Sequence, residues 1–131
     1  MEINPIGFVR NSAEEKTDWE TLISELVILP EYEEGLYRIE EMPEILVIFY
    51  FDRAEEIKMR VHPKHDHSIP KVGVFASRSP TRPNFLGITK VRLLERRANV
   101  LVIEGLDALN GTPIIDIKPA VRWDQLDKSE K

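Results

Sequence analysis

The stretch Ile45-Leu-Val-Ile-Phe-Tyr-Phe51 decides the fold class of this chain. Every residue in it is β-branched, aromatic or leucine, and the first two of these classes are enriched in β-strands. The run has the length of a strand, whereas a membrane-spanning helix needs about 20 apolar residues. We therefore expect a central strand here, and we expect residues 57–61 to pair with it.

Further short strands are expected on both sides of this segment. Apolar runs bounded by Pro and Gly predict one or two helical turns over 31–42 and strands at 3–10, 24–29, 72–76, 88–94 and 100–105. Asn110-Gly111 is a tight-turn signal, which predicts a hairpin between 100–109 and 114–117.

Many short strands with little helix predict an all-β fold. Closure into a small β-barrel would remove the exposed strand edges. With 131 residues the chain fits one domain, which we place at 1–123, followed by a polar tail at 124–131. It has no cysteine, which excludes a disulfide scaffold, and its N-terminus has no export signal. We expect a cytoplasmic protein with no membrane segment.

Charge is distributed unevenly along the chain. Residues 1–52 carry three Lys/Arg against thirteen Asp/Glu, and residues 53–97 carry eleven against four, with all three histidines. Such asymmetry suggests a basic face for an anionic partner such as nucleic acid. The alternative is that the acidic and basic segments pair with each other across the sheet.

The densest motif is Gly73-Val-Phe-Ala-Ser-Arg-Ser-Pro-Thr-Arg-Pro-Asn-Phe-Leu-Gly87. Pro80 and Pro83 restrict its backbone, so Arg78 and Arg82 are held in set directions. A guanidinium suits a carboxylate or a phosphate. The alternative is a structural turn whose arginines pair with acidic residues of the first third.

A second candidate lies in the stretch 105–119. Asp107 is placed to accept from ribose hydroxyls or an ammonium group, although an aspartate there can also simply brace a hairpin. Asp116 and Lys118 should share one face of a strand.

The histidines His62, His65 and His67 have spacing that suits a metal, but no fourth ligand can be named, and we expect no metal. A serine hydrolase is not expected either, because no Gly-x-Ser-x-Gly motif occurs.

The 73–87 motif resembles the signature of the TrmO (YaeB-like, TsaA-like) family of S-adenosylmethionine-dependent tRNA methyltransferases. Residues 5–10, 35–51 and 105–119 resemble further blocks of that family in the same order. The resemblance implies a small β-barrel, a homodimer and S-adenosylmethionine as cofactor. It also implies N6-methylation of threonylcarbamoyladenosine at position 37 of tRNA.

Residue by residue, the resemblance places cofactor contacts at Phe51, Asp52, Arg78, Ile88, Asp107, Ala108, Leu109 and Asn110. We expect adenine against the apolar members, the methionine carboxylate on Arg78, and the ribose or ammonium on Asp107. Substrate contacts are expected at Arg82, Asn84 and Lys118. No catalytic residue is assigned. Glu44, Asp52 and Asn110 depart from the family pattern, which usually has His, His and Asp there.

Two other functions stay open at this point. The chain could be a methyltransferase of the same fold that acts on another RNA or on a small molecule. It could instead be a non-catalytic module that binds S-adenosylmethionine or RNA.

Overall fold

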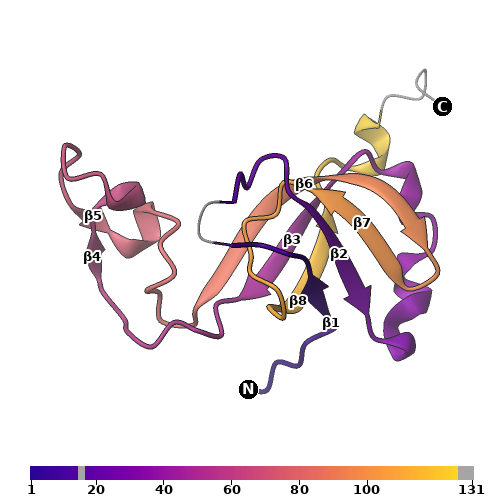
Figure 1. Cartoon of the computed structure of the whole chain (residues 1–131), viewed down its shortest axis with the longest axis horizontal. Helices are drawn as coiled ribbons and strands as arrows, with labels where there is room; N and C mark the ends of the chain where they lie inside the picture. The colour runs from indigo at the N-terminus through magenta and orange to yellow at the C-terminus, as the bar shows by residue number, and fades with distance from the viewer. Residues whose placement is uncertain (15–16, 127–131) are drawn as a thin grey trace.

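The computed structural model describes residues 1–14 and 17–126. Its body is a closed, antiparallel six-stranded barrel in the order β1-β2-β7-β6-β3-β8 (Figure 1). The strands are β1 (Gly7–Arg10), β2 (Ile23–Ile28), β3 (Glu44–Tyr50), β6 (Leu86–Arg97), β7 (Val100–Glu104) and β8 (Pro113–Pro119). The expected all-β barrel is therefore confirmed. No helix within the described residues has the length and hydropathy to cross a membrane.

The barrel interior is filled by alternate residues of each strand. On β3, the side chains of Ile45, Val47 and Phe49 are buried and face the core, as its apolar pattern predicts. Gly87 on β6 pairs with Phe49, and a Cβ there would lie 2.8 Å from the Cζ atoms of Phe49 and Phe51. The glycine that closes the 73–87 motif therefore lets two aromatic rings pack against the backbone.

The expected helical turns are present as two 3₁₀ segments, η1 (Pro30–Leu36) and η2 (Ile39–Glu41). Leu36 is buried in the core, and Ile39 packs against it. A further 3₁₀ segment, η5 (Trp123–Gln125), overlaps the start of the polar tail expected at 124–131. Residues 127–131 of that tail lie outside the described part of the chain.

Two of the expected strand pairings are wrong. Residues 57–61 do not pair with β3, because its two edges are occupied by β6 and β8. Instead β4 (Arg60–Val61) pairs with β5 (Val72–Gly73) in a separate two-stranded sheet.

The hairpin expected at Asn110-Gly111 is also absent, because β7 is flanked by β2 and β6 whereas β8 is flanked by β3 and β1. The chain turns at Asn110-Gly111, but residues 105–112 form a link between non-adjacent strands that buries Leu106 and Ala108.

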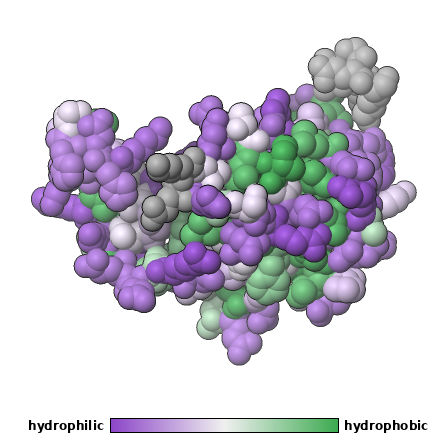
Figure 2. Space-filling model, in the orientation of Figure 1, coloured by the Kyte–Doolittle hydropathy of each residue, from purple (hydrophilic) through white to green (hydrophobic). Residues whose placement is uncertain are grey.

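Residues 52–85 form an arm that leaves the barrel after β3 and returns at β6. It carries β4, β5 and the 3₁₀ segments η3 (Pro63–His65) and η4 (Val74–Ala76), and it projects to the left in Figure 1. Backbone hydrogen bonds close its base, from Phe51 N to Phe85 O at 2.8 Å and from Lys58 N to Thr81 O at 2.9 Å. Its visible face is mostly hydrophilic, while hydrophobic residues gather over the barrel (Figure 2).

Candidate functional site

Three segments distant in sequence line neighbouring cavities where the arm joins the barrel: the end of β3, the loop 77–89 that enters β6, and the link 105–112. One cavity, of about 270 Å³, is lined by Phe49, Phe51, Ser77, Arg78, Arg82, Asp107 and residues 86–89. A second, of about 360 Å³, is lined by Trp19, Phe49, residues 51–54, Pro80, residues 107–109 and Thr112. Phe49, Phe51 and Asp107 line both cavities, so the two are adjoining parts of one site.

The loop at Ser77–Ser79 is held by its own side chains. Arg82 Nη1 donates to the carbonyl oxygens of Val74 at 3.0 Å, Ser77 at 2.7 Å and Ser79 at 3.4 Å. Ser77 Oγ also donates to Val74 O at 2.9 Å. Arg82 therefore stabilises the loop backbone on both sides of Arg78, and this restricts the direction in which the Arg78 side chain extends.

The Arg78 side chain is exposed and lines the 270 Å³ cavity. Its Nη1 lies 3.5 Å from Ile88 O, and it forms no ion pair with any residue of 1–14 or 17–126. The expected alternative, pairing with acidic residues of the first third, does not occur for Arg78. Its guanidinium is available to an anionic ligand.

Asp107 is the carboxylate at the centre of the site. It is exposed, although both its neighbours in the chain are buried, with Leu106 at 0% and Ala108 at 4% relative exposure. Its Oδ1 accepts a hydrogen bond from Thr89 Oγ1 at 2.6 Å, and it has no ion pair among the described residues. Thr89 thereby orients a carboxylate that no cation of the described chain neutralises.

The 360 Å³ cavity has an apolar wall as well as the charged residues Asp52 and Arg53. Phe51, Ala108 and Leu109 line the 360 Å³ cavity, and the Phe51 ring meets Phe49 edge-on with centroids 5.1 Å apart. Asp52 also lines this cavity. Seven of the eight expected cofactor residues therefore line the two cavities: Phe51, Asp52, Arg78, Ile88, Asp107, Ala108 and Leu109.

Two of the eight expected cofactor residues differ from the rest in their relation to the cavities. Ile88 lines the 270 Å³ cavity, but strand alternation places its side chain on the outer face of β6, opposite Ile48. Asn110 does not line either cavity. Its Oδ1 instead accepts from Asn11 N at 3.0 Å, which fastens the link to the end of β1.

The expected substrate residues are dispersed. Arg82 is in the loop interior, and Asn84 is exposed at the turn beside it. Lys118 lies on β8, outside the cavity linings described here, and pairs with Asp116 at 3.3 Å on the same strand face, as expected. Substrate binding by these three residues stays a prediction.

Thr89, Trp19 and Asn11 belong to the site but were not anticipated from the sequence. Trp19 had one available signal, because a tryptophan is unusual in an otherwise polar stretch. Asn11 Nδ2 donates to Ala108 O at 2.9 Å and to Ser24 Oγ at 2.9 Å. Neither this role nor that of Thr89 has a local sequence signal.

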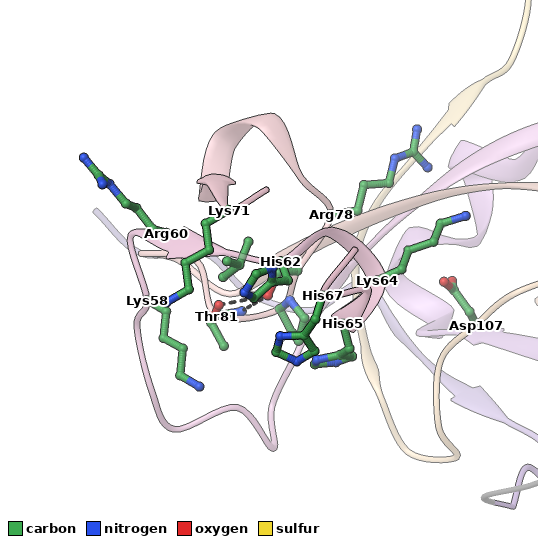
Figure 3. A pocket seen from close by; sticks show the side chains of 13 residues that line it. Lys58, Arg60, His62, Lys64, His65, His67, Lys71, Arg78, Thr81 and Asp107 are labelled. Carbon is green, nitrogen blue, oxygen red and sulfur yellow. Dashed lines mark hydrogen bonds between the residues drawn. The ribbon is translucent and has the colours of Figure 1, made fainter. Parts of the chain in front are cut away.

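A larger cavity, of about 900 Å³, lies along the arm, and we call it the arm cleft (Figure 3). The His62 and His67 rings contact each other within it at a tilt of 47°, with centroids 4.2 Å apart, and His62 Nδ1 lies 3.0 Å from Ile69 O. Within the described chain no group of His, Asp and Glu side chains is arranged to hold a metal ion. Asp66 caps the turn beside them, where hydrogen bonds from the Ser68 hydroxyl and amide hold the pKa of its carboxyl below the ordinary value.

Sequence comparison finds relatives over nearly the whole chain. The family model described as the tRNA-methyltransferase O N-terminal domain matches residues 12–127. An Archaeoglobus fulgidus protein named "S-adenosyl-L-methionine-binding protein" is 40% identical over 124 residues, which cover 90% of this chain and 88% of the relative. A Pseudomonas aeruginosa protein named "Putative S-adenosylmethionine-dependent methyltransferase RcsF" is 35% identical over 132 residues, covering 92% of this chain and 57% of the relative.

Structure comparison agrees with the sequence matches. A crystal structure of TrmO from Pseudomonas aeruginosa superposes with a TM-score of 0.74 at 29% identity, covering all of this chain and 60% of that one. A second crystal structure of TrmO superposes with a TM-score of 0.76 at 30% identity, covering all of this chain and 62% of that one.

The sequence matches also include a relative that is much longer than this chain. This protein of Archaeoglobus fulgidus, named "Probable S-adenosyl-L-methionine-binding protein", is 50% identical over 95 residues, and the match spans only 25% of its length.

Proposed function

Because the chain belongs to the family of the tRNA-methyltransferase O N-terminal domain, we propose that it is an S-adenosylmethionine-dependent methyltransferase that acts on tRNA. The reaction we propose is methylation at N6 of threonylcarbamoyladenosine, at position 37 beside the anticodon. The methyl group passes from the sulfonium sulfur to N6, the N6–H proton is released, and S-adenosylhomocysteine leaves.

One observation carries the cofactor assignment. A cation and a carboxylate without ion-pair partners in the described chain, Arg78 and Asp107, line one cavity of about 270 Å³ together with the Phe51 ring. S-adenosylmethionine has matching parts, because its amino-acid end carries a carboxylate and an ammonium group and its adenine is a flat aromatic base whose faces pack on apolar side chains. We assign the methionine carboxylate to Arg78, the ammonium or ribose hydroxyls to Asp107, and adenine to the wall of Phe51, Ala108 and Leu109.

The protein's contribution to the reaction is positioning. S-adenosylmethionine supplies a methyl group that already carries a good leaving group. The chain therefore has to hold the cofactor and the target nitrogen in line and keep water out, and a rigid loop and link suit that task. Asp107 is the single carboxylate lining the 270 Å³ cavity, and the hydrogen bond from Thr89 fixes its orientation. We assign no general base.

A second candidate function is a non-catalytic module that binds S-adenosylmethionine. The observation in its favour is that the archaeal relative with the fuller coverage is named for binding alone. Methyl transfer to another RNA or to a small molecule is the third candidate. All three share the cofactor site and differ in what occupies the space beside it.

The test uses the intact chain in two measurements. Calorimetry with S-adenosylmethionine should show one binding site. A transfer assay with labelled cofactor should methylate tRNA that carries the threonylcarbamoyl group and leave tRNA without it unlabelled, and nucleoside mass spectrometry should place the methyl at N6. Equal labelling of both tRNA pools would contradict the proposed substrate, and binding without any transfer would favour the module.

We also propose that residues 1–123 act as the catalytic domain, that the protein is cytoplasmic, and that it works as a homodimer with the cofactor loop near the subunit boundary.

A further inference from the structure

The fold divides the basic segment 53–97 between two places. Residues 53–85 lie in the arm and carry seven Lys/Arg against three Asp/Glu, together with the three histidines. Residues 86–97 lie on β6 and carry four against one. Both parts have an excess of positive charge in the sequence. Which of them can bind an anionic partner therefore depends on whether folding places carboxylates beside their cations.

The arginines of β6 are paired with carboxylates. Arg92 pairs with Glu104 of β7, and Arg97 pairs with Glu95 at 3.2 Å. Arg96 has a side chain only 19% exposed, lies 3.6 Å from Glu40, and donates to Leu36 O at 3.3 Å. Only Arg96 pairs with the acidic first third of the chain, as the alternative in the sequence supposed, but all three arginines are neutralised by a carboxylate. Lys90, the fourth cation of β6, forms no ion pair among the described residues and is a single charge on the strand.

The arm cleft is different, because most of its cations have no carboxylate partner. Among the described residues only Lys58 is paired, with Glu56 at 3.8 Å. No ion pair involves the other four Lys/Arg side chains of the lining in that part of the chain. These four are Arg60, Lys64, Lys71 and Arg78. Three histidines add ring nitrogens to the same wall.

The cleft opens onto the cofactor site. Arg78 and Asp107 line both the arm cleft and the 270 Å³ cavity, and Asp107 is the one carboxylate in the cleft lining. In Figure 3, Lys64 and Arg78 lie on the side of the cleft nearer Asp107, whereas Lys58, Arg60 and Lys71 lie toward the far side. A ligand that fills the cleft therefore has one end beside Arg78 and Asp107 and the rest along the arm.

We propose that the arm cleft binds the sugar–phosphate backbone of the RNA strand on one side of the target nucleotide, an inference that rests on the proposed function. Several unpaired cations spread along a cavity of about 900 Å³ suit a run of phosphates better than a single anion. Cations of this kind also disfavour a metal ion on the histidines. The arm thus sets the register of the RNA, while the link and the 77–89 loop hold the cofactor.

The experiment compares two triple variants that each remove three positive charges. The arm variant is Arg60→Gln, Lys64→Gln, Lys71→Gln, and the matched barrel variant is Lys90→Gln, Arg97→Gln, Arg122→Gln. Fluorescence anisotropy measures tRNA binding between 50 and 200 mM salt, and calorimetry measures S-adenosylmethionine binding. The arm variant should bind tRNA at least about tenfold more weakly, and the slope of log affinity against log salt should fall by about 2. The barrel variant should change affinity by less than about threefold, and both should keep their cofactor affinity.

Charge-conserving replacement separates charge from shape. The variant Arg60→Lys, Lys64→Arg, Lys71→Arg should bind tRNA nearly as well as the unaltered chain, and circular dichroism checks that every variant is folded. Unchanged tRNA affinity in a folded arm variant, or an equal loss in both triple variants, would overturn the inference. Failure of the unaltered chain to bind S-adenosylmethionine or to transfer methyl would instead contradict the proposed function, and the tRNA binding data would still decide the role of the arm.

Discussion

At the scale of single residues, the site depends on two unneutralised charges. Arg78 has no ion pair in the described chain and is presented by a loop that Arg82 holds through three carbonyls. We expect Arg78→Ala to weaken S-adenosylmethionine binding by about 2 kcal/mol, or roughly thirtyfold, because a carboxylate partner is lost. Calorimetry on the folded variant measures this. Unchanged affinity would remove Arg78 from the cofactor site.

Thr89 provides a subtler test of the same site. Its hydroxyl donates to Asp107 Oδ1 at 2.6 Å, so Thr89→Val removes the bond while it conserves the shape of the side chain. We expect cofactor affinity to fall by about 1 kcal/mol, roughly fivefold, because the carboxylate is no longer oriented. Thr89→Ser keeps the hydroxyl and is the control, so equal losses in both variants would contradict the orienting role.

At the scale of elements, Gly87 links the start of β6 to the aromatic wall of the site. A Cβ at this position would lie 2.8 Å from the rings of both Phe49 and Phe51. We expect Gly87→Ala to destabilise the fold by about 1–3 kcal/mol, because the rings have to shift within a packed core. Urea unfolding measures the change. Gly35→Ala is the matched control, since nothing lies within 4 Å of the Cβ it would add. A similar stability for the two variants would show that the ring packing is not tight.

The arm and β6 show how elements redistribute charge. The three arginines of β6 pair with carboxylates on β7, on η2 and on β6 itself, whereas four cations of the arm cleft form no ion pair in the described chain. An ion pair between exposed groups contributes little to stability. Such a pair does, however, lower the positive electrostatic potential around the cation. The potential at β6 is therefore weaker than at the arm, and an anionic RNA strand is attracted more strongly to the arm.

At the scale of the whole molecule, the proposed homodimer needs a surface near the cofactor loop. Ile88, 43% exposed on the outer face of β6, and Tyr50, 37% exposed on the adjacent β3, form an apolar area there. We expect Ile88→Glu to convert a dimer into a monomer, because a charge at the interface centre would be buried without a partner. Sedimentation at micromolar concentration measures this. A monomeric unaltered chain that still methylates tRNA would show that the dimer is dispensable.

The sequence by itself determined the strands of the barrel and the loop that carries Arg78. These features depend on residues adjacent in the chain. The apolar run 45–51, for example, predicts the strand β3 from its own composition, whatever position the strand takes in the sheet. The family resemblance named most of the residues that line the two cavities for a similar reason, because the 73–87 motif and the 105–112 link are continuous stretches. The strand expected at 72–76 was only partly right, because β5 ends at Gly73 and residues 74–76 form the 3₁₀ segment η4.

Only the tertiary structure decided which strands are neighbours, and therefore what surrounds each side chain. A period-2 pattern shows that residues 57–61 and 114–117 are suited to strands, but it does not say which edge they occupy, so both predicted pairings failed. Thr89 reaches Asp107 across 18 positions, and Asn11 reaches Ala108 across 97. Barrel closure creates these contacts, and it also separates the neutralised arginines of β6 from the unpaired cations of the arm. Charge in a sequence is a count, whereas charge at a site depends on the partners that folding brings within a few ångströms.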